Sequence, residues 1–142
     1  MVKDKRMKSI NFNVPVKMQF KTKKKISNKL ISYNLIFAMN NMFSKSKFKK
    51  KYKDLITSCL PKDTEQLKGK YRIDYIYHYE NKGQGKNSDA PNVISILSKS
   101  INDLLQELEI VVNDNVMFCV SESWIIGEPT DEPYVNVNIY EA

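Results

Sequence analysis

The sequence predicts a mixed α/β fold, with a small mixed β-sheet and two main helices in a single domain spanning residues 1–142. Three observations indicate this class. Several short segments alternate apolar and polar residues, the spacing of half-buried strands, and two longer segments repeat apolar residues at helical spacing. The length suits one compact domain, and 42% of the residues are hydrophobic, an ordinary globular composition.

The N-terminal part predicts one strand followed by an irregular stretch. Residues 10–20, INFNVPVKMQF, alternate apolar and polar side chains, and Pro15 indicates an edge strand or a bend. Residues 26–43 are apolar without a regular period. We interpret them as a loop or short helix, because Asn40 and Asn41 favour a turn.

A basic amphipathic helix is predicted over residues 46–60, because Phe48, Tyr52, Ile56 and neighbouring apolar side chains recur at helical spacing and Pro61 ends the pattern. A strand follows over residues 70–80. Its apolar side is Tyr71, Ile73, Tyr75, Tyr77 and Tyr79. Tyrosines can stack on bases, but an aromatic stripe in a strand is more often core, and we adopt the core interpretation.

The second helix is predicted within residues 88–115. Its apolar stripe comprises Ile94, Leu97, Ile101, Leu104, Leu105 and Leu108. Ser88 or Asp89 can cap its start, and Pro91 suits its first turn. Asn92, Lys99 and Asp103 share the opposite face. Two final strands, over residues 116–125 and 134–142, are expected to pair with each other.

Charge is divided unevenly along the chain, whose net charge is +7. Residues 1–70 contain 19 Lys and Arg against 4 Asp and Glu, whereas residues 71–142 contain 4 against 12. Lysine clusters of this kind attract nucleic-acid phosphates by releasing counterions. We expect DNA contacts from Lys23, Lys24, Lys25, Lys45, Lys47, Lys49, Lys50 and Lys51. The alternative is a solvated lysine surface with no nucleic-acid partner.

Several classes of protein have little support. No apolar run is long enough to cross a membrane, and the basic N-terminus lacks the apolar segment of a signal peptide, so we expect a cytoplasmic protein without a membrane partner. Cys59, Cys119 and the single His78 lack metal-ligand spacing, which argues against a zinc site and a Cys-His catalytic pair. Both thiols are expected to be reduced.

Three aspartates are associated with the second helix and suggest a metal site. Asp89 precedes the helix, Asp103 lies on its polar face, and Asp114 follows its end. Hydrolysis of a phosphodiester bond commonly uses a divalent cation, and Mg²⁺ prefers carboxylate oxygens and water. Lys99, four residues before Asp103, can contact the scissile phosphate. The alternative is an ordinary polar helix face with a cap at Asp89 and a turn at Asp114.

These motifs resemble the RusA family of Holliday-junction resolvases, which are small homodimeric nucleases of bacteria and bacteriophages. Asp89 and Asn92 match part of an aspartate-rich signature, Lys99 and Asp103 match a lysine and aspartate four residues apart, and Asp114 matches one member of a late aspartate pair. The resemblance implies a Mg²⁺- or Mn²⁺-dependent endonuclease acting as a homodimer on branched DNA. It also implies that Asp89, Asp103 and Asp114 bind the metal and that Lys99 contacts phosphate.

The sequence departs from this pattern at two positions. Pro91 stands where a second aspartate is expected, and Asn113 replaces the first aspartate of the late pair. Fewer carboxylates weaken binding of Mg²⁺. Two alternatives therefore remain beside the nuclease: a nucleic-acid-binding module of the same fold that has lost catalysis, and a basic protein whose partner is an acidic protein.

Overall fold

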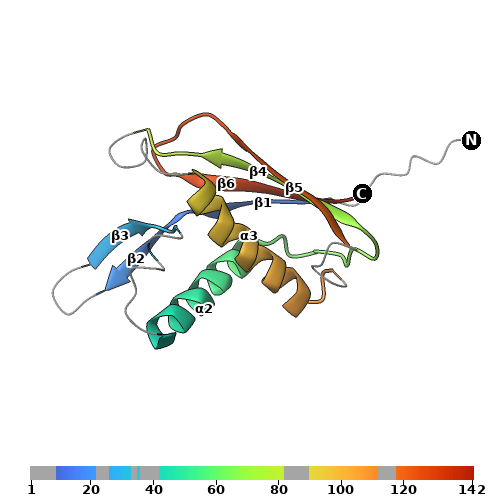
Figure 1. The fold of residues 1–142 in the computed structure, drawn as a ribbon, viewed down its shortest axis with the longest axis horizontal. Coiled ribbons are helices and arrows are strands. Elements are labelled where there is room, and N and C mark those ends of the chain that lie inside the picture. The colour runs from blue at the N-terminus through green and yellow to red at the C-terminus, as the bar shows by residue number, and fades with distance from the viewer. Residues whose placement is uncertain (1–8, 22–25, 33–34, 36–41, 82–89, 112–117) are drawn as a thin grey trace, which may run out of the picture.

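The computed structural model of the chain describes residues 9–21, 26–32, 35, 42–81, 90–111 and 118–142. It confirms the mixed α/β class, with a four-stranded sheet, a two-stranded hairpin and two helices (Figure 1). The elements in chain order are β1 (Ser9–Pro15), β2 (Lys17–Lys21), β3 (Ile26–Leu30), α2 (Met42–Cys59), β4 (Tyr71–His78), α3 (Ala90–Glu107), β5 (Cys119–Ile126) and β6 (Tyr134–Glu141).

The strands of the larger sheet follow the order β1-β6-β4-β5. β6 is antiparallel to both β1 and β4, whereas β5 is parallel to β4. The expectation that the two final strands pair with each other is wrong, because β4 lies between them. The reason is the connection through α3: a helix between two strands carries the chain back across the sheet, so β5 returns parallel to β4.

The segment predicted as one strand over residues 10–20 forms two strands. β1 ends at Pro15, which confirms the bend, and β2 leaves the larger sheet to pair with β3. The interpretation of residues 26–30 as loop or helix is wrong. Most β3 side chains are exposed, so β3 shows no apolar alternation, and its backbone pairing with β2 defines it. The helix predicted from residue 46 begins earlier, at Met42.

Both helices lie on the same side of the larger sheet (Figure 1). Against them the sheet presents alternate residues of three strands, all buried: Ile10, Phe12, Val14, Tyr71, Ile73, Tyr75, Tyr77, Val135, Val137 and Ile139. α2 contributes Phe48, Tyr52 and Ile56, and α3 contributes most of its predicted stripe. The core interpretation of the β4 tyrosines is therefore confirmed for the three within the strand, while Tyr79 lies beyond it and is half-buried.

The end of α3 explains why Leu108, predicted to be buried, is 44% exposed. Glu109 takes a positive φ of 57°, the left-handed conformation that commonly ends a helix. The N–H of Glu109 donates to the Gln106 carbonyl at 3.0 Å, and that of Ile110 donates to the Leu105 carbonyl at 2.8 Å. The helix closes here, and Ile110 rather than Leu108 turns into the core.

Both cysteines are free thiols, as predicted for Cys59 and Cys119. Neither helix within the described segments has the length and apolarity that a membrane span requires.

Candidate functional site

Lys99 and Asp103 lie on the polar face of α3, as their spacing predicted. The Lys99 ammonium donates to Oδ1 of Asp103 at 3.3 Å, and the side chains are 76% and 32% exposed. An ion pair of this kind on a helix surface contributes only about 0.5 kcal/mol or less. The ammonium is therefore held weakly and remains available to an incoming phosphate.

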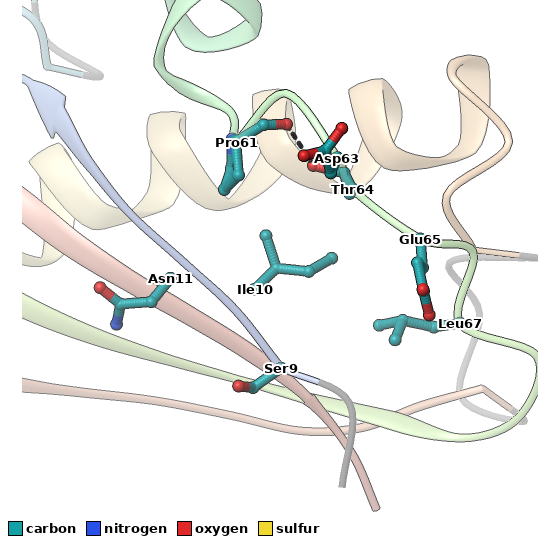
Figure 2. Close-up of a pocket in the computed structure, with 8 residues that line it drawn as sticks. All are labelled: Ser9, Ile10, Asn11, Pro61, Asp63, Thr64, Glu65 and Leu67. Atoms are coloured by element: carbon teal, nitrogen blue, oxygen red, sulfur yellow. Dashed lines mark hydrogen bonds between the residues drawn. The ribbon is translucent and has the colours of Figure 1, made fainter. Parts of the chain in front are cut away.

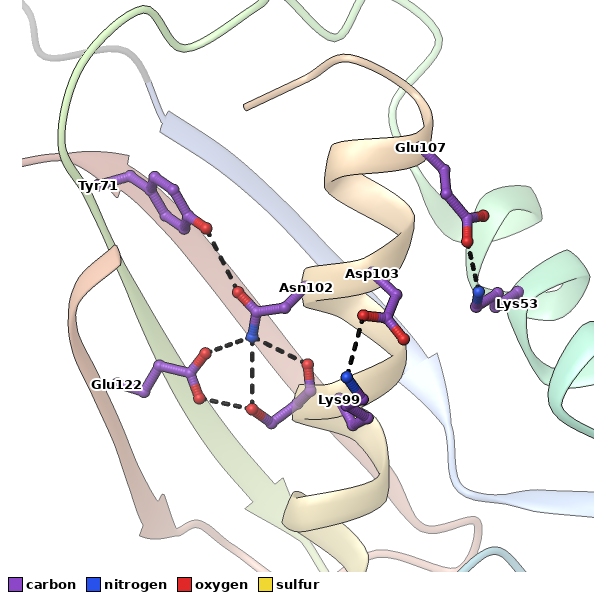
Figure 3. A network of polar contacts seen from close by, with 8 residues as sticks. Lys53, Tyr71, Lys99, Asn102, Asp103, Glu107 and Glu122 are labelled. Carbon is purple, nitrogen blue, oxygen red and sulfur yellow. Dashed lines mark hydrogen bonds and ion pairs between the residues drawn. The ribbon is translucent and has the colours of Figure 1, made fainter. Parts of the chain in front are cut away.

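The polar face of α3 continues toward α2. Glu107 lies one helical turn beyond Asp103 and accepts a hydrogen bond from the Lys53 ammonium of α2, with 2.6 Å between Nζ and Oε1. Figure 3 shows the two ion pairs on the same flank of α3. The residues Lys99, Asp103 and Glu107 thus form a charged stripe that leads from α3 to the lysine-rich helix.

Most lysines of α2 lie on the side of the helix that faces away from the core. Lys47, Lys49, Lys50 and Lys51 are exposed, and Lys45 is half-buried. Lys51 also donates to the backbone carbonyl of Gln19 in β2 at 3.0 Å, which joins the helix to the hairpin. Lys23, Lys24 and Lys25, which were also predicted to contact DNA, lie outside the described residues.

Asp89 and Asp114 also lie outside the described residues, whereas the helix between them is described. α3 is continuous from Ala90 to Glu107, so Ala90 and Asp103 are thirteen residue steps apart, about 20 Å along the axis. Asp103 is therefore far from the start of the helix, and the metal-binding role of Asp89, which precedes that start, stays a prediction.

The end of α3 constrains the segment that leads to Asp114. After α3 the chain turns back, and the N–H groups of Ile110 and Val111 both donate to the carbonyl of Leu105. Asp114 follows Val111 by three residues, a span of at most about 10 Å. The chain between Val111 and Asp114 is thus short, and a shared ion for Asp103 and Asp114 stays a prediction.

The described part of the chain does not by itself form a metal centre. Within it, no three His, Cys, Asp or Glu side chains are grouped so that they could hold an ion. The single histidine is held by contacts between structural elements. His78 stacks on Tyr134 with ring centroids 4.5 Å apart, and its Nδ1 is 2.9 Å from the carbonyl oxygen of Glu128. Of the three aspartates predicted to bind the metal, only Asp103 lies among the described residues, and its metal-binding role stays a prediction.

Sequence reasoning did not identify a carboxylate on the opposite flank of α3. Glu122 of β5 accepts a hydrogen bond from the Ser98 hydroxyl at 2.5 Å and another from the side-chain amide of Asn102 (Figure 3). Asn102 also accepts from the Tyr71 hydroxyl at 3.3 Å. The sequence feature that could have indicated this contact is the polar pair Ser98 and Asn102, which lie four residues apart on the same side of the helix. Only the position of β5 identifies Glu122 as the acceptor for both.

Two titratable groups beside Glu122 have raised pKa values. Burial disfavours the Cys119 thiolate, and the negative charge of Glu122 raises the pKa of this thiol further. Burial also raises the pKa of Tyr75 well above its ordinary value, and Glu122 adds to that effect, while the nearby Ser98 hydroxyl acts in the opposite direction. Both groups stay protonated near neutral pH, so this cluster offers no activated nucleophile.

A small pocket of about 220 Å³ lies between the start of β1 and the segment that follows α2 (Figure 2). Asp63 and Glu65 line it, together with Asn11, and the Thr64 hydroxyl donates to the Pro61 carbonyl at 2.6 Å. Its lining contains carboxylates but no lysine, arginine or histidine. The pocket therefore lacks the positive charge that a phosphate-binding site needs.

The chain matches no protein-family model and no curated protein.

Proposed function

We propose that this protein binds DNA through the lysines of α2 and cleaves it in a metal-dependent reaction at the polar face of α3. The observation that carries the proposal is the continuity of these two surfaces. The Lys53–Glu107 ion pair, at 2.6 Å, joins the lysine-rich helix to the stripe that presents Lys99 and Asp103. A phosphate backbone bound along α2 can therefore extend to the candidate catalytic residues.

The lysines supply the binding step. Exposed ammonium groups neutralise phosphates and release condensed counterions, a contribution that does not depend on base sequence. Lys99 is the most exposed member of the charged stripe, at 76%, and its contact with Asp103 is weak enough to be exchanged for a phosphate oxygen. In this scheme Lys99 binds the phosphate nearest to the reacting bond.

The chemical step requires carboxylates beyond those described. Asp103 would hold the cation together with Asp114, whereas Asp89 would act at the start of α3. When bound, Mg²⁺ or Mn²⁺ would activate water and offset charge at the phosphate. The resemblance to Holliday-junction resolvases suggests branched DNA as the substrate class and two sites in a homodimer.

Cleavage of labelled DNA tests this proposal. The purified protein is incubated with a four-way junction, a linear duplex and a single strand, with Mg²⁺, with Mn²⁺ or with a chelator. We expect metal-dependent nicking of the junction. Asp103→Asn and Asp114→Asn should each slow it by about a hundredfold or more. Asp131→Asn, which removes an exposed carboxylate of the β5–β6 connection, is the matched control and should cleave normally.

A second candidate function is DNA binding without cleavage. It is favoured by Pro91, which occupies the first turn of α3 where the resemblance calls for a carboxylate. It is also favoured by the ammonium of Lys99, which lies beside Asp103, the one described aspartate of the three predicted to bind metal. Retarded migration of the junction with no nicking under either cation would select this function. Failure to bind any of the three DNA substrates at low salt would overturn both.

A further inference from the structure

β5 is an edge strand with an unusual concentration of exposed apolar side chains. Val120 and Trp124 are each 41% exposed, Ile125 is 59% exposed and Ile126 is 51% exposed. Only two other large hydrophobic side chains in the described segments are exposed to this extent, Ile26 on β3 and Leu108 just after α3. Single exposed apolar residues are common, but four on one strand form a patch that indicates an interaction surface.

The backbone of β5 also has hydrogen-bonding groups directed away from the sheet. Within the part of the chain that the structure describes, β5 pairs only with β4. The N–H of Gly127 donates to the Tyr77 carbonyl of β4 at 2.9 Å. Because backbone groups alternate in direction along a strand, those of Trp124 and Ile126 point toward the free edge.

The edge has few of the features that protect exposed strands. Proteins commonly place lysine, proline or an inward-pointing charge there. β5 contains neither lysine nor proline, and its only charge, Glu122, is held by Ser98 and Asn102 of α3. Its C-terminal half, from Ser123 to Ile126, carries no charge at all. A second strand can therefore approach this half without burying a charged group.

We propose that β5 pairs with β5 of a second copy of this chain, antiparallel and related by a two-fold axis through Ile125. In this register Ile125 faces Ile125 of the second copy on the open side of the sheet. Trp124 faces Ile126 on the helix side. Each copy thus places its exposed apolar residues against the same residues of the other, as an isologous interface requires.

The register follows from the directions of the backbone groups. Trp124 and Ile126 point their N–H and C=O groups outward, so they form a hydrogen-bonded pair across the interface. Ile125 then forms a non-hydrogen-bonded pair with its symmetry mate, in which the Cα atoms of an antiparallel ladder are about 4.5 Å apart. The two copies of Glu122 do not approach each other, because each lies three residues from the axis. In this register Glu122 comes opposite Glu128 of the second copy, outside the apolar half.

The area of the patch suits a pair of identical partners. Roughly half of each of the four side chains is exposed. This corresponds to at most about 400 Å², because even an aromatic side chain presents only roughly 200 Å². A stable interface buries about 800 Å² on each partner. The patch therefore supplies at most about half of the area that each copy contributes, and the backbone edge beside it adds to that area. This inference is independent of whether the protein cleaves DNA.

Solution mass provides the first test, by light scattering at tens of micromolar protein without DNA. We expect a dimer, and Ile125→Lys should raise its dissociation constant at least about tenfold, because two ammonium groups would meet at the axis. Ile26→Lys is the matched control, since Ile26 is 63% exposed on β3, away from the edge, and it should leave the dimer intact. The proposal is overturned if the unsubstituted protein is a monomer, including a monomer that binds another protein through β5. It is also overturned if Ile125→Lys dimerises as tightly as the unsubstituted protein.

Disulfide crosslinking tests the register even if the lysine variant folds poorly. In a background carrying Cys59→Ser and Cys119→Ser, Ile125→Cys should form a dimer under mild oxidation, because the expected Cα separation lies within disulfide range. Ser123→Cys lies on the same face of β5 but should not crosslink. In this register residue 123 faces residue 127 of the second copy, so the two cysteines are separated by four residues along the strand. Crosslinking at position 123 and not at position 125 would refute the two-fold axis through Ile125.

Discussion

The side-chain amide of Asn102 in α3 donates to the carboxylate of Glu122 in β5, while its side-chain oxygen accepts from the Tyr71 hydroxyl of β4 at 3.3 Å. One helical residue therefore binds the edge strand and the strand next to it. β5 is otherwise held mainly by its parallel ladder with β4. The Asn102–Glu122 contact fixes how the edge strand sits against the helix that covers the sheet.

We expect Asn102→Ala to lower the free energy of unfolding by about 1–2 kcal/mol, because two hydrogen bonds between α3 and the sheet are lost. Chemical denaturation monitored by circular dichroism measures the change. Gln106→Ala, one turn along the same helix and exposed, is the control and should change stability by no more than about 0.5 kcal/mol. Equal effects of the two variants would show that Asn102 does not anchor β5.

Glu122→Gln should make the Cys119 thiol more reactive. Burial is the main cause of the raised pKa of Cys119, and the charge of Glu122 is the second. Removing that charge lowers the pKa, so the thiolate fraction at a given pH increases. The measurement is the pH dependence of iodoacetamide alkylation in a Cys59→Ser background. The midpoint should move to lower pH but remain above that of an exposed thiol, because Cys119 is still partly buried.

Neutralising lysines on α2 should weaken DNA binding and reduce its dependence on salt. The triple variant of Lys47, Lys49 and Lys50 to glutamine should decrease the slope of log affinity against log salt by roughly three units if each contacts one phosphate. A matched variant changes Lys62, Lys68 and Lys70, which are exposed between α2 and β4, and removes the same net charge. Equal slopes for the two triple variants would argue against α2 as the DNA surface.

Tyr52→Phe should stabilise the protein at neutral pH. The Tyr52 side chain is 1% exposed, and its hydroxyl is buried without a hydrogen-bond partner in the described part of the chain. Its ring stacks on Phe48, with centroids 6.1 Å apart, and phenylalanine preserves that contact. Removing the unpaired hydroxyl should raise the free energy of unfolding by about 1 kcal/mol. Tyr134→Phe, a partly exposed tyrosine, should have little effect.

The same substitution should change the response to alkaline pH. Burial raises the pKa of Tyr52 above its ordinary value, and a nearby Cys59 thiolate would raise it further. The folded protein therefore retains this proton at a pH where the unfolded chain has lost it, so stability falls as pH rises above about 10. Denaturation at pH 7 and pH 10.5 should show a smaller loss in Tyr52→Phe than in the parent.

Prediction from sequence succeeded where a buried face imposes its own period. The tyrosines of β4 alternate, and the apolar residues of α3 recur at helical spacing, because each element has one side in the core and another in water. The position of Lys99 beside Asp103 followed from the same helical spacing, which needs no tertiary information. Pro15 and Pro61 marked a bend and a helix end because proline restricts the backbone locally.

Prediction failed where an element is defined by its neighbours. β3 is mostly exposed, so only its pairing with β2 makes it a strand. Glu122 has no local pattern that indicates a partner, and Ser98 and Asn102 reach it because α3 crosses beside β5. Leu108 continued the apolar period of the helix, yet the left-handed backbone of Glu109 ends α3 and leaves it exposed.

The sequence by itself determined the fold class, the buried faces and the division of charge, because these depend on side-chain type and short-range spacing. The strand order was decided by the tertiary structure, since pairing between distant strands depends on which connections can cross the sheet. The structure likewise separated Asp103 from the start of α3, a consequence of the rigid rise of one continuous helix. It also placed an apolar strand at the free edge, because the position of β5 depends on every other strand of the sheet.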